Sequence, residues 1–296
     1  MSLTRTFLFA TVIFSVCSSV FSQVSRGVVN EGLTVKSKIL KEDVRYTIYL
    51  PYDYGTSSRY YPVVYLLHGY TDNDMGWMQF GEAHMIADEA IGHREIPPMI
   101  LVMPDGGVSF YINNYDNSTR YEDFFIKEFV PYIEKKYRIR SEKRYRGVAG
   151  LSMGGFGSLI YALKHPDMFA ACAAFSAAVF TEEEIINMDE EIWPIIGRLF
   201  GPELEGKARI TEHLLSNSPI HLVQNTDIEQ IKSTWMYIDC GDDDFLYKGN
   251  STFHIILRDL NVSHEYRVRD GGHQWSYWRS GLADGLKFIG TSFHQP

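Results

Sequence analysis

The chain has 296 residues, enough for one large domain or two modest ones and too many for a small fold held together by disulfides. Hydrophobic residues make up 45% and charged residues 22% of the chain, so its composition is that of a globular protein and excludes a disordered or collagen-like one. The formal net charge is −9, and because a surface this acidic repels phosphate backbones, we expect no nucleic-acid partner.

Residues 1–22 have the features of a secretory signal peptide, with one positive charge at Arg5, an apolar run and small residues near the end. The apolar run, residues 7–16, is about half the length that a membrane-spanning helix needs, so we expect no membrane span. Cys17 would permit a lipoprotein, but the residue before it is larger than lipidation signals prefer. The sequence therefore predicts that residues 23–296 are secreted or periplasmic.

From residue 23 onward, short apolar runs typical of strands alternate with helical patterns, and no repeat or linker divides the chain. The predicted strands are 33–40, 44–50, 63–67, 99–103, 146–150, 169–176, 234–240 and 264–268. The predicted helices are 85–91, 121–137, 153–164, 250–260 and 278–289. Such an order indicates one α/β domain, with an antiparallel start, a mostly parallel sheet of eight strands and helices on both faces. We expect the long insertion at about 181–226 to pack over the site as a cap.

Two cysteines remain after the signal peptide, Cys172 and Cys240. If their strands are parallel neighbours, the two thiols are offset by several residues, and at about 3.3 Å per residue that offset exceeds the reach of a disulfide. We therefore predict two buried free cysteines.

The sharpest motif is Gly150-Leu151-Ser152-Met153-Gly154, which stands between the predicted strand 146–150 and the predicted helix 153–164. This strand–turn–helix context is that of a nucleophile elbow, in which a strained serine is exposed at the end of a strand. The glycines have a steric reason, because side chains at a tight elbow would meet neighbouring backbone. The sequence thus predicts Ser152 as a nucleophile, with the backbone N–H of Met153 stabilising the oxyanion.

A serine nucleophile needs a base and an orienting acid, which follow it in the order acid, then histidine, on this kind of fold. His273 is the predicted base because it stands in a Gly-rich loop directly after the last strand. The acid should follow the strand 234–240, where Asp242, Asp243 and Asp244 are adjacent, and spacing alone does not choose among them. We interpret His68, after the strand 63–67, as a structural residue of the second oxyanion loop.

Five collinear motifs, spread from about residue 30 to 290, resemble the esterase D-like branch of the α/β-hydrolases, which includes feruloyl esterases, acetylxylan esterases and S-formylglutathione hydrolases. They are Leu66-Leu67-His68-Gly69, Met103-Pro104-Asp105-Gly106, Tyr121-Glu122-Asp123-Phe124, Gly150-Leu151-Ser152-Met153-Gly154-Gly155 and Gly271-Gly272-His273-Gln274-Trp275. The resemblance implies an α/β-hydrolase fold, with Asp244 as the acid and the N–H of Tyr70 as the second oxyanion donor. Gln274 departs from the family, which often has Asp at that position.

Export, acidity and the aromatic content of 14% favour a secreted esterase acting on esterified plant cell-wall polysaccharide. We expect feruloyl (hydroxycinnamoyl) esters as substrates. The alternatives are an acetylxylan esterase, a thioesterase similar to S-formylglutathione hydrolase, and a non-catalytic glycan-binding protein. Aromatic candidates for contacting the acyl group are Trp77, Phe110, Tyr111, Trp193 and Trp275, and Trp193 is equally able to anchor the insertion to the body of the domain. No spacing of His, Cys and Asp resembles a ligand set, so we expect no metal and no cofactor.

Overall fold

The structure is a computed structural model, and it describes residues 25–294. The predicted signal peptide, residues 1–22, lies outside the described residues.

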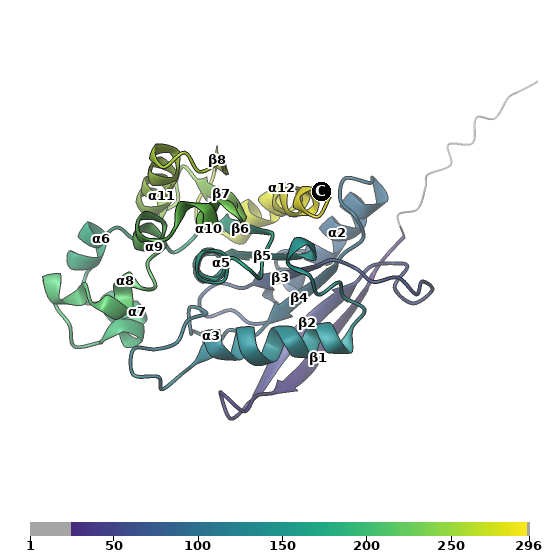
Figure 1. The fold of residues 1–296 in the computed structure, drawn as a ribbon, viewed down its shortest axis with the longest axis horizontal. Coiled ribbons are helices and arrows are strands. Elements are labelled where there is room, and N and C mark those ends of the chain that lie inside the picture. The colour runs from purple at the N-terminus through teal and green to yellow at the C-terminus, as the bar shows by residue number, and fades with distance from the viewer. Residues whose placement is uncertain (1–24, 295–296) are drawn as a thin grey trace, which may run out of the picture.

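One eight-stranded sheet with the order β1-β2-β4-β3-β5-β6-β7-β8 forms the centre of the molecule (Figure 1). β1 pairs antiparallel with β2 and β2 antiparallel with β4, whereas all pairs from β4 through β3 to β8 are parallel. The predicted fold class, a mostly parallel α/β-hydrolase sheet with an antiparallel start, is confirmed. The strands are β1 Val28–Lys36, β2 Asp43–Leu50, β3 Val63–Leu67, β4 Ile100–Pro104, β5 Arg146–Leu151, β6 Ala171–Phe175, β7 Trp235–Gly241 and β8 Glu265–Arg269.

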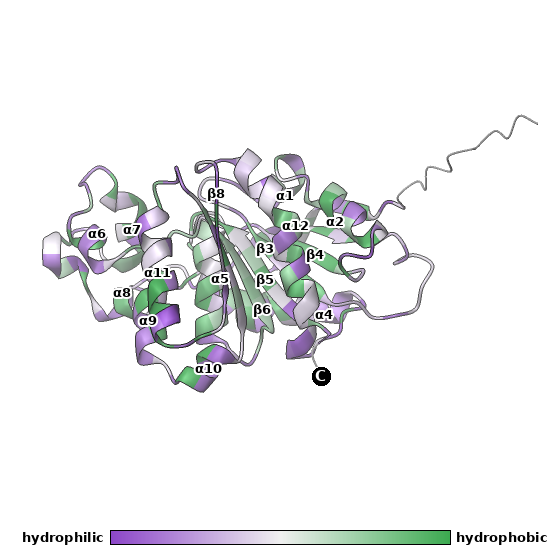
Figure 2. Cartoon of the chain, turned by 90° about the horizontal axis from the view of Figure 1, so that it is seen from above, coloured by the Kyte–Doolittle hydropathy of each residue, from purple (hydrophilic) through white to green (hydrophobic). Residues whose placement is uncertain are grey.

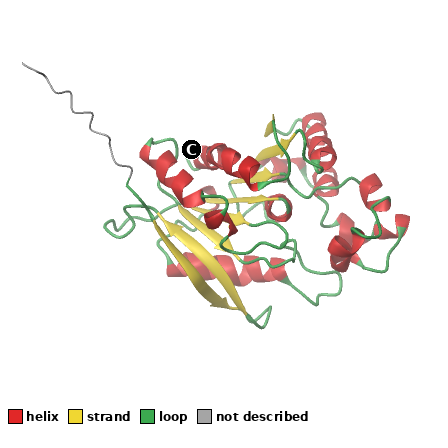
Figure 3. Ribbon diagram, turned by 180° about the vertical axis from the view of Figure 1, so that it is seen from behind, coloured by secondary structure: helices red, strands yellow, loops and turns green. Residues whose placement is uncertain are grey.

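Helices cover both faces of the sheet, as the apolar strands predicted (Figure 3). One face carries α5, α11 and the continuous helix formed by α3, the π-helical turn η1 and α4, and the other carries α2 and α12. Outside the insertion the helical segments are α1 Gly76–Gln79, α2 Ala83–Gly92, α3 Tyr121–Phe124, η1 Phe125–Phe129, α4 Val130–Lys136, η2 Lys143–Tyr145, α5 Met153–Lys164, α11 Tyr247–Asp259 and α12 Trp275–Ser292.

The two hydrophobic cores follow the alternation of side chains along the strands. In β3, Val63, Tyr65 and Leu67 belong to the core under α5, whereas Val64 and Leu66 belong to the core under α12. All five are fully buried, which explains why the sequence shows a continuous apolar run. Figure 2 shows the hydrophobic character of the central strands in the colouring of β3, β5 and β6.

The chain between β6 and β7 contains the predicted insertion. Its helical segments are α6 Glu182–Ile186, α7 Trp193–Phe200, η3 Gly206–Arg209, α8 Glu212–Leu215, α9 Pro219–Asn225 and α10 Ile228–Lys232. α9 packs against α5 and α11 in the body of the domain, whereas α6, α7 and α8 extend at one end of the molecule (Figures 1 and 2).

The first strand differs from the prediction. β1 occupies Val28–Lys36 rather than 33–40, and its pairing with β2 is irregular between Asn30 and Leu33. This bulge shifts the side-chain alternation by one position, so the periodicity of the sequence hides the first half of the strand. The prediction for the cysteines is confirmed, since Cys172 and Cys240 are both buried and free.

Candidate active site

Ser152 lies between β5 and α5 with a strained backbone, φ 53° and ψ −116°. Its N–H donates to the carbonyl of Phe175 (2.8 Å), and its carbonyl accepts from the N–H of Ala178 (3.0 Å), so the end of β6 holds this conformation on both sides. A Cβ at Gly154 would lie 2.2 Å from the carbonyl oxygen of Leu67, and one at Gly150 would lie 2.4 Å from the backbone of Gly154. The glycines of the motif are therefore required by the close approach of three backbone segments.

His273 connects Ser152 to Asp244. Its Nε2 lies 2.9 Å from the hydroxyl oxygen of Ser152, and its Nδ1 lies 2.9 and 3.1 Å from the two carboxylate oxygens of Asp244. The side chain of Asp244 is fully buried and that of His273 is 19% exposed. With the proton on Nδ1 donated to Asp244, Nε2 is free to accept the serine proton, which is the arrangement that activates a hydroxyl.

The environment of Asp244 keeps its carboxylate ionised. Burial raises the pKa of Asp244, but hydrogen bonds from His273, Ser176 and the N–H of Leu246 outweigh burial and bring the pKa below its ordinary value. Ser176 in turn accepts a hydrogen bond from the indole N–H of Trp278 (3.0 Å). A buried anion next to the imidazole stabilises the positive charge that His273 gains when it takes a proton.

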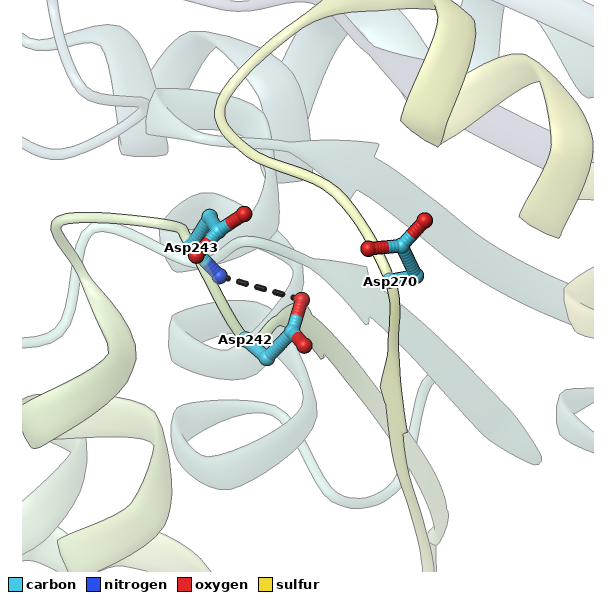
Figure 4. Close-up of side chains that lie close together, drawn as sticks. All are labelled: Asp242, Asp243 and Asp270. Atoms are coloured by element: carbon cyan, nitrogen blue, oxygen red, sulfur yellow. Dashed lines mark hydrogen bonds between the residues drawn. The ribbon is translucent and has the colours of Figure 1, made fainter.

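The other two aspartates of the triplet have a different role. Asp242 accepts from the N–H of Gly271 (3.0 Å) and of Asp243 (3.1 Å), and so ties the loop after β7 to the loop after β8. Figure 4 shows Asp242, Asp243 and Asp270 close together. All three are exposed, and within residues 25–294 they form the one group of His, Cys, Asp or Glu side chains with ligand atoms close enough for a metal. Exposed carboxylates of this kind are common on solvated turns and indicate no metal by themselves.

Beside Ser152 lies the loop that carries Tyr70. A Cβ at Gly69 would lie 3.7 Å from the Cβ of Ser152. Nε2 of the buried His68 accepts from the N–H of Gly106 (2.7 Å), so Nδ1 carries the proton and donates to the carbonyl of Gly69 (2.8 Å). Because that carbonyl and the N–H of Tyr70 belong to one peptide unit, His68 fixes the direction of the N–H.

The side chain of Tyr70 is held in place by contacts with Phe110 and Arg198. Its ring packs at 6.0 Å from the ring of Phe110, and the guanidinium of Arg198 lies 5.6 Å from its centroid. Arg198 belongs to α7 and also donates to the carbonyl of Val108, so the insertion contacts the loop next to the serine.

A cavity of about 770 Å³ opens at Ser152 and His273. Of the predicted binding residues, Phe110 and Trp275 line it, and so does Tyr70. The insertion contributes Met188, Ile192, Ile195 and Ile196, as expected of a cap, and further lining residues that the sequence did not single out are Asp72, Phe80, Phe180, Phe245 and Trp278. The rings of Phe245 and Trp278 lie 4.5 and 4.9 Å from the ring of His273.

The prediction that Trp77, Tyr111 and Trp193 contact the substrate is wrong for this cavity, because none of the three lines it and all three are buried packing residues. Trp77 and Tyr111 are fully buried and donate hydrogen bonds to the carbonyls of Leu67 and His68 respectively. Both therefore hold the end of β3, from which the Tyr70 loop starts.

Trp193 packs within the insertion, and its buried ring belongs to the same hydrophobic core as the sheet face under α5. It is buried, its indole N–H donates to the carbonyl of Pro202 (3.1 Å), and the guanidinium of Arg209 lies 4.6 Å from its ring. Arg209 also donates to the carbonyls of Ile185 and Met188. The sequence left two roles open for Trp193, contact with the acyl group and anchoring of the insertion. The geometry agrees with anchoring.

The chain matches a family model described as "Putative esterase" over residues 37–289. It belongs to this esterase family. A solved structure of a ferulic acid esterase is 35% identical to this esterase chain, with a TM-score of 0.76, and the match covers 90% of this chain and 99% of that one. The resemblance inferred from the sequence motifs is thereby confirmed.

Two curated relatives are longer than this chain. An esterase of Mycobacterium tuberculosis (strain ATCC 25618 / H37Rv) is 32% identical over 248 residues, covering 76% of this chain and 51% of the relative. An endo-1,4-beta-xylanase/feruloyl esterase of Xylanibacter ruminicola is 35% identical over 145 residues, covering 47% of this chain and 20% of the relative. The chain thus spans about half the length of the first and a fifth of the second. None of the helices within residues 25–294 has the length and apolar character needed to cross a membrane.

Proposed function

We propose that this chain is a secreted serine esterase that hydrolyses hydroxycinnamoyl esters on plant cell-wall polysaccharide through an acyl-enzyme. The observation that carries the proposal is the large apolar cavity that opens at a hydrogen-bonded Ser152, His273 and Asp244. An acetyl group would leave most of this cavity empty, whereas a phenylpropenoyl group can contact its aromatic and aliphatic walls. The likeness to a ferulic acid esterase supports the same substrate class.

In the proposed acylation step, the oxygen of Ser152 attacks the ester carbonyl while Nε2 of His273 takes the hydroxyl proton. The negative charge that develops on the carbonyl oxygen is stabilised by the N–H groups of Tyr70 and Met153. When the carbon–oxygen bond to the alcohol breaks, His273 returns the proton to the leaving oxygen. Water then repeats the sequence, and the products are the carboxylic acid and free Ser152.

The test uses purified residues 23–296 with methyl ferulate and with acetylated xylan, and the Ser152→Ala variant as the control. We expect kcat/KM to be much higher for the feruloyl ester and to fall by several orders of magnitude in the variant. Higher activity on acetylated xylan would overturn the proposed substrate, and a variant that keeps more than about a tenth of the activity would overturn the proposed nucleophile. Export is tested separately, by determining the N-terminus of the protein recovered outside the cytoplasm, which should be residue 23.

A further inference from the structure

Two sets of residues in the lining of the cavity differ in their chemistry. The insertion wall, as we call Met188, Ile192, Ile195 and Ile196, is entirely aliphatic or thioether in character. The loop wall, as we call Asp72, Phe80, Gln274 and Trp275, combines two aromatic rings with a carboxylate and an amide. A feruloyl ring can pack on either wall, but the loop wall also offers a carboxylate and an amide, which can hydrogen-bond several hydroxyl groups.

The chemistry of the ester places the alcohol near the loop wall. The leaving oxygen takes its proton from Nε2 of His273, so it must lie within hydrogen-bond distance of that nitrogen. Gln274 and Trp275 line the cavity, and the ring of Trp275 lies 5.5 Å from that of Trp278, which in turn lies 4.9 Å from the ring of His273. The ring of Trp275 lies 5.8 Å from the ring of Phe80, at an angle of 38°. The alcohol therefore starts beside the residues of the loop wall.

The loop wall suits a sugar. The side chain of Phe80 is 51% exposed, and with Trp275 it presents ring surface on which the C–H face of a sugar can stack. One carboxylate oxygen of Asp72 accepts from the N–H of Asn73 (2.9 Å). A carboxylate accepts up to about four hydrogen bonds, so Asp72 retains capacity for sugar hydroxyls. Gln274 is exposed and offers both donors and an acceptor.

We infer that Asp72, Phe80, Gln274 and Trp275 form a subsite for the sugar ring whose hydroxyl carries the acyl group. This inference rests on the proposed esterase function and adds to it the part of the cavity that binds the alcohol. The enzyme then distinguishes a glycosyl ester from a simple alkyl ester by contacts that only the sugar can make.

The experiment compares kcat/KM on a feruloylated oligosaccharide with kcat/KM on methyl ferulate, because both substrates carry the same acyl group. Phe80→Ala and Asp72→Asn should lower the ratio of the two values about ten- to a hundredfold, the effect of losing one good contact to a polar ligand. Ile195→Ala, in the insertion wall, should lower both values by the same factor. Tyr60→Ala removes an aromatic side chain that is 57% exposed and outside the cavity, and it should change neither.

A second measurement separates the subsite from the reaction. Calorimetry with the deacylated oligosaccharide should detect binding to the Ser152→Ala variant. The affinity should be at least about tenfold lower in the double variant that also carries Phe80→Ala. Wild-type protein that hydrolyses neither ester would refute the esterase function, while calorimetry would still decide whether the sugar binds. A ratio that stays within twofold in both loop-wall variants, or sugar binding that Phe80→Ala leaves unchanged, would overturn the subsite.

Discussion

Replacing Asp244 by Asn tests the orienting role proposed for this residue. One carboxylate oxygen of Asp244 accepts from the N–H of Leu246 (2.9 Å), and the other lies 2.9 Å from Nδ1 of His273. In Asp244→Asn the amide oxygen keeps the bond to Leu246, so the NH₂ group faces Nδ1. Nδ1 must then accept a hydrogen bond, and the proton moves to Nε2, which faces Ser152 at 2.9 Å. An imidazole in this tautomer cannot take the serine proton.

We expect kcat to fall about 10⁴-fold, which corresponds to about 5.5 kcal/mol in the activation free energy. Asp242→Asn and Asp243→Asn are matched controls from the same turn. An Asn at residue 242 can still accept from Gly271, and residue 243 is exposed, so both controls should stay within about threefold of wild type. The assay is steady-state hydrolysis of a feruloyl ester at neutral pH, with circular dichroism to verify folding. Comparable losses in all three variants, or a loss below tenfold in Asp244→Asn, would refute the reasoning.

Three further predictions follow from buried groups. Trp193→Ala removes a buried ring from the hydrophobic core and should destabilise the protein by about 3–5 kcal/mol, seen as a lower melting temperature, whereas the ratio of kcat/KM on feruloyl and acetyl esters should change less than twofold. A selective loss on the feruloyl ester would show instead that the ring contacts substrate. His68→Ala frees the peptide that carries the N–H of Tyr70 and should lower kcat about a hundredfold with KM nearly constant, and an equal rise in KM would contradict a positioning role. Burial raises the pKa of Cys172 and Cys240 to about 12, so iodoacetamide at pH 8 should label neither thiol until denaturant is added, and rapid labelling of folded protein would show that the thiols are accessible.

The positions of Ser152 and His273 could be predicted because the signal is local. The close backbone contacts around a nucleophilic serine require glycines, and these glycines are visible in the motif at the strand–helix junction. Because the base follows the serine and the acid in the chain, few histidines are candidates for it. Asp244 could not be separated from Asp242 by spacing, because the two differ only in the direction in which one turn points them. That direction depends on hydrogen bonds with Ser176, which is distant in the sequence, and with the backbone N–H of Leu246. Neither contact can be recognised from the spacing of the aspartates.

The aromatic residues of the cavity were the least predictable part of the site. Trp77 and Trp193 are buried while Phe80 and Phe245 are exposed, and ring type alone carries no information about which side of a helix or loop faces the cavity. One signal was available, since Trp278 follows Trp275 by three positions and residues at this spacing share a helix face. The signal required knowing that α12 begins at Trp275 rather than at residue 278.

The position of the insertion wall at the edge of the hydrophobic core has a consequence for how this enzyme could diversify. Trp193 and Arg209 hold α6 and α7 together by hydrogen bonds and a ring contact made within the insertion, and the buried residues of these helices join the core of the domain. Ile192 and Ile195, which line the cavity, are 52% and 37% exposed and lie outside the hydrophobic core. Substitutions at these two positions can therefore accumulate at little cost to folding, so acyl selectivity can change over evolution, or in a directed library, without disturbing the elbow that holds Ser152.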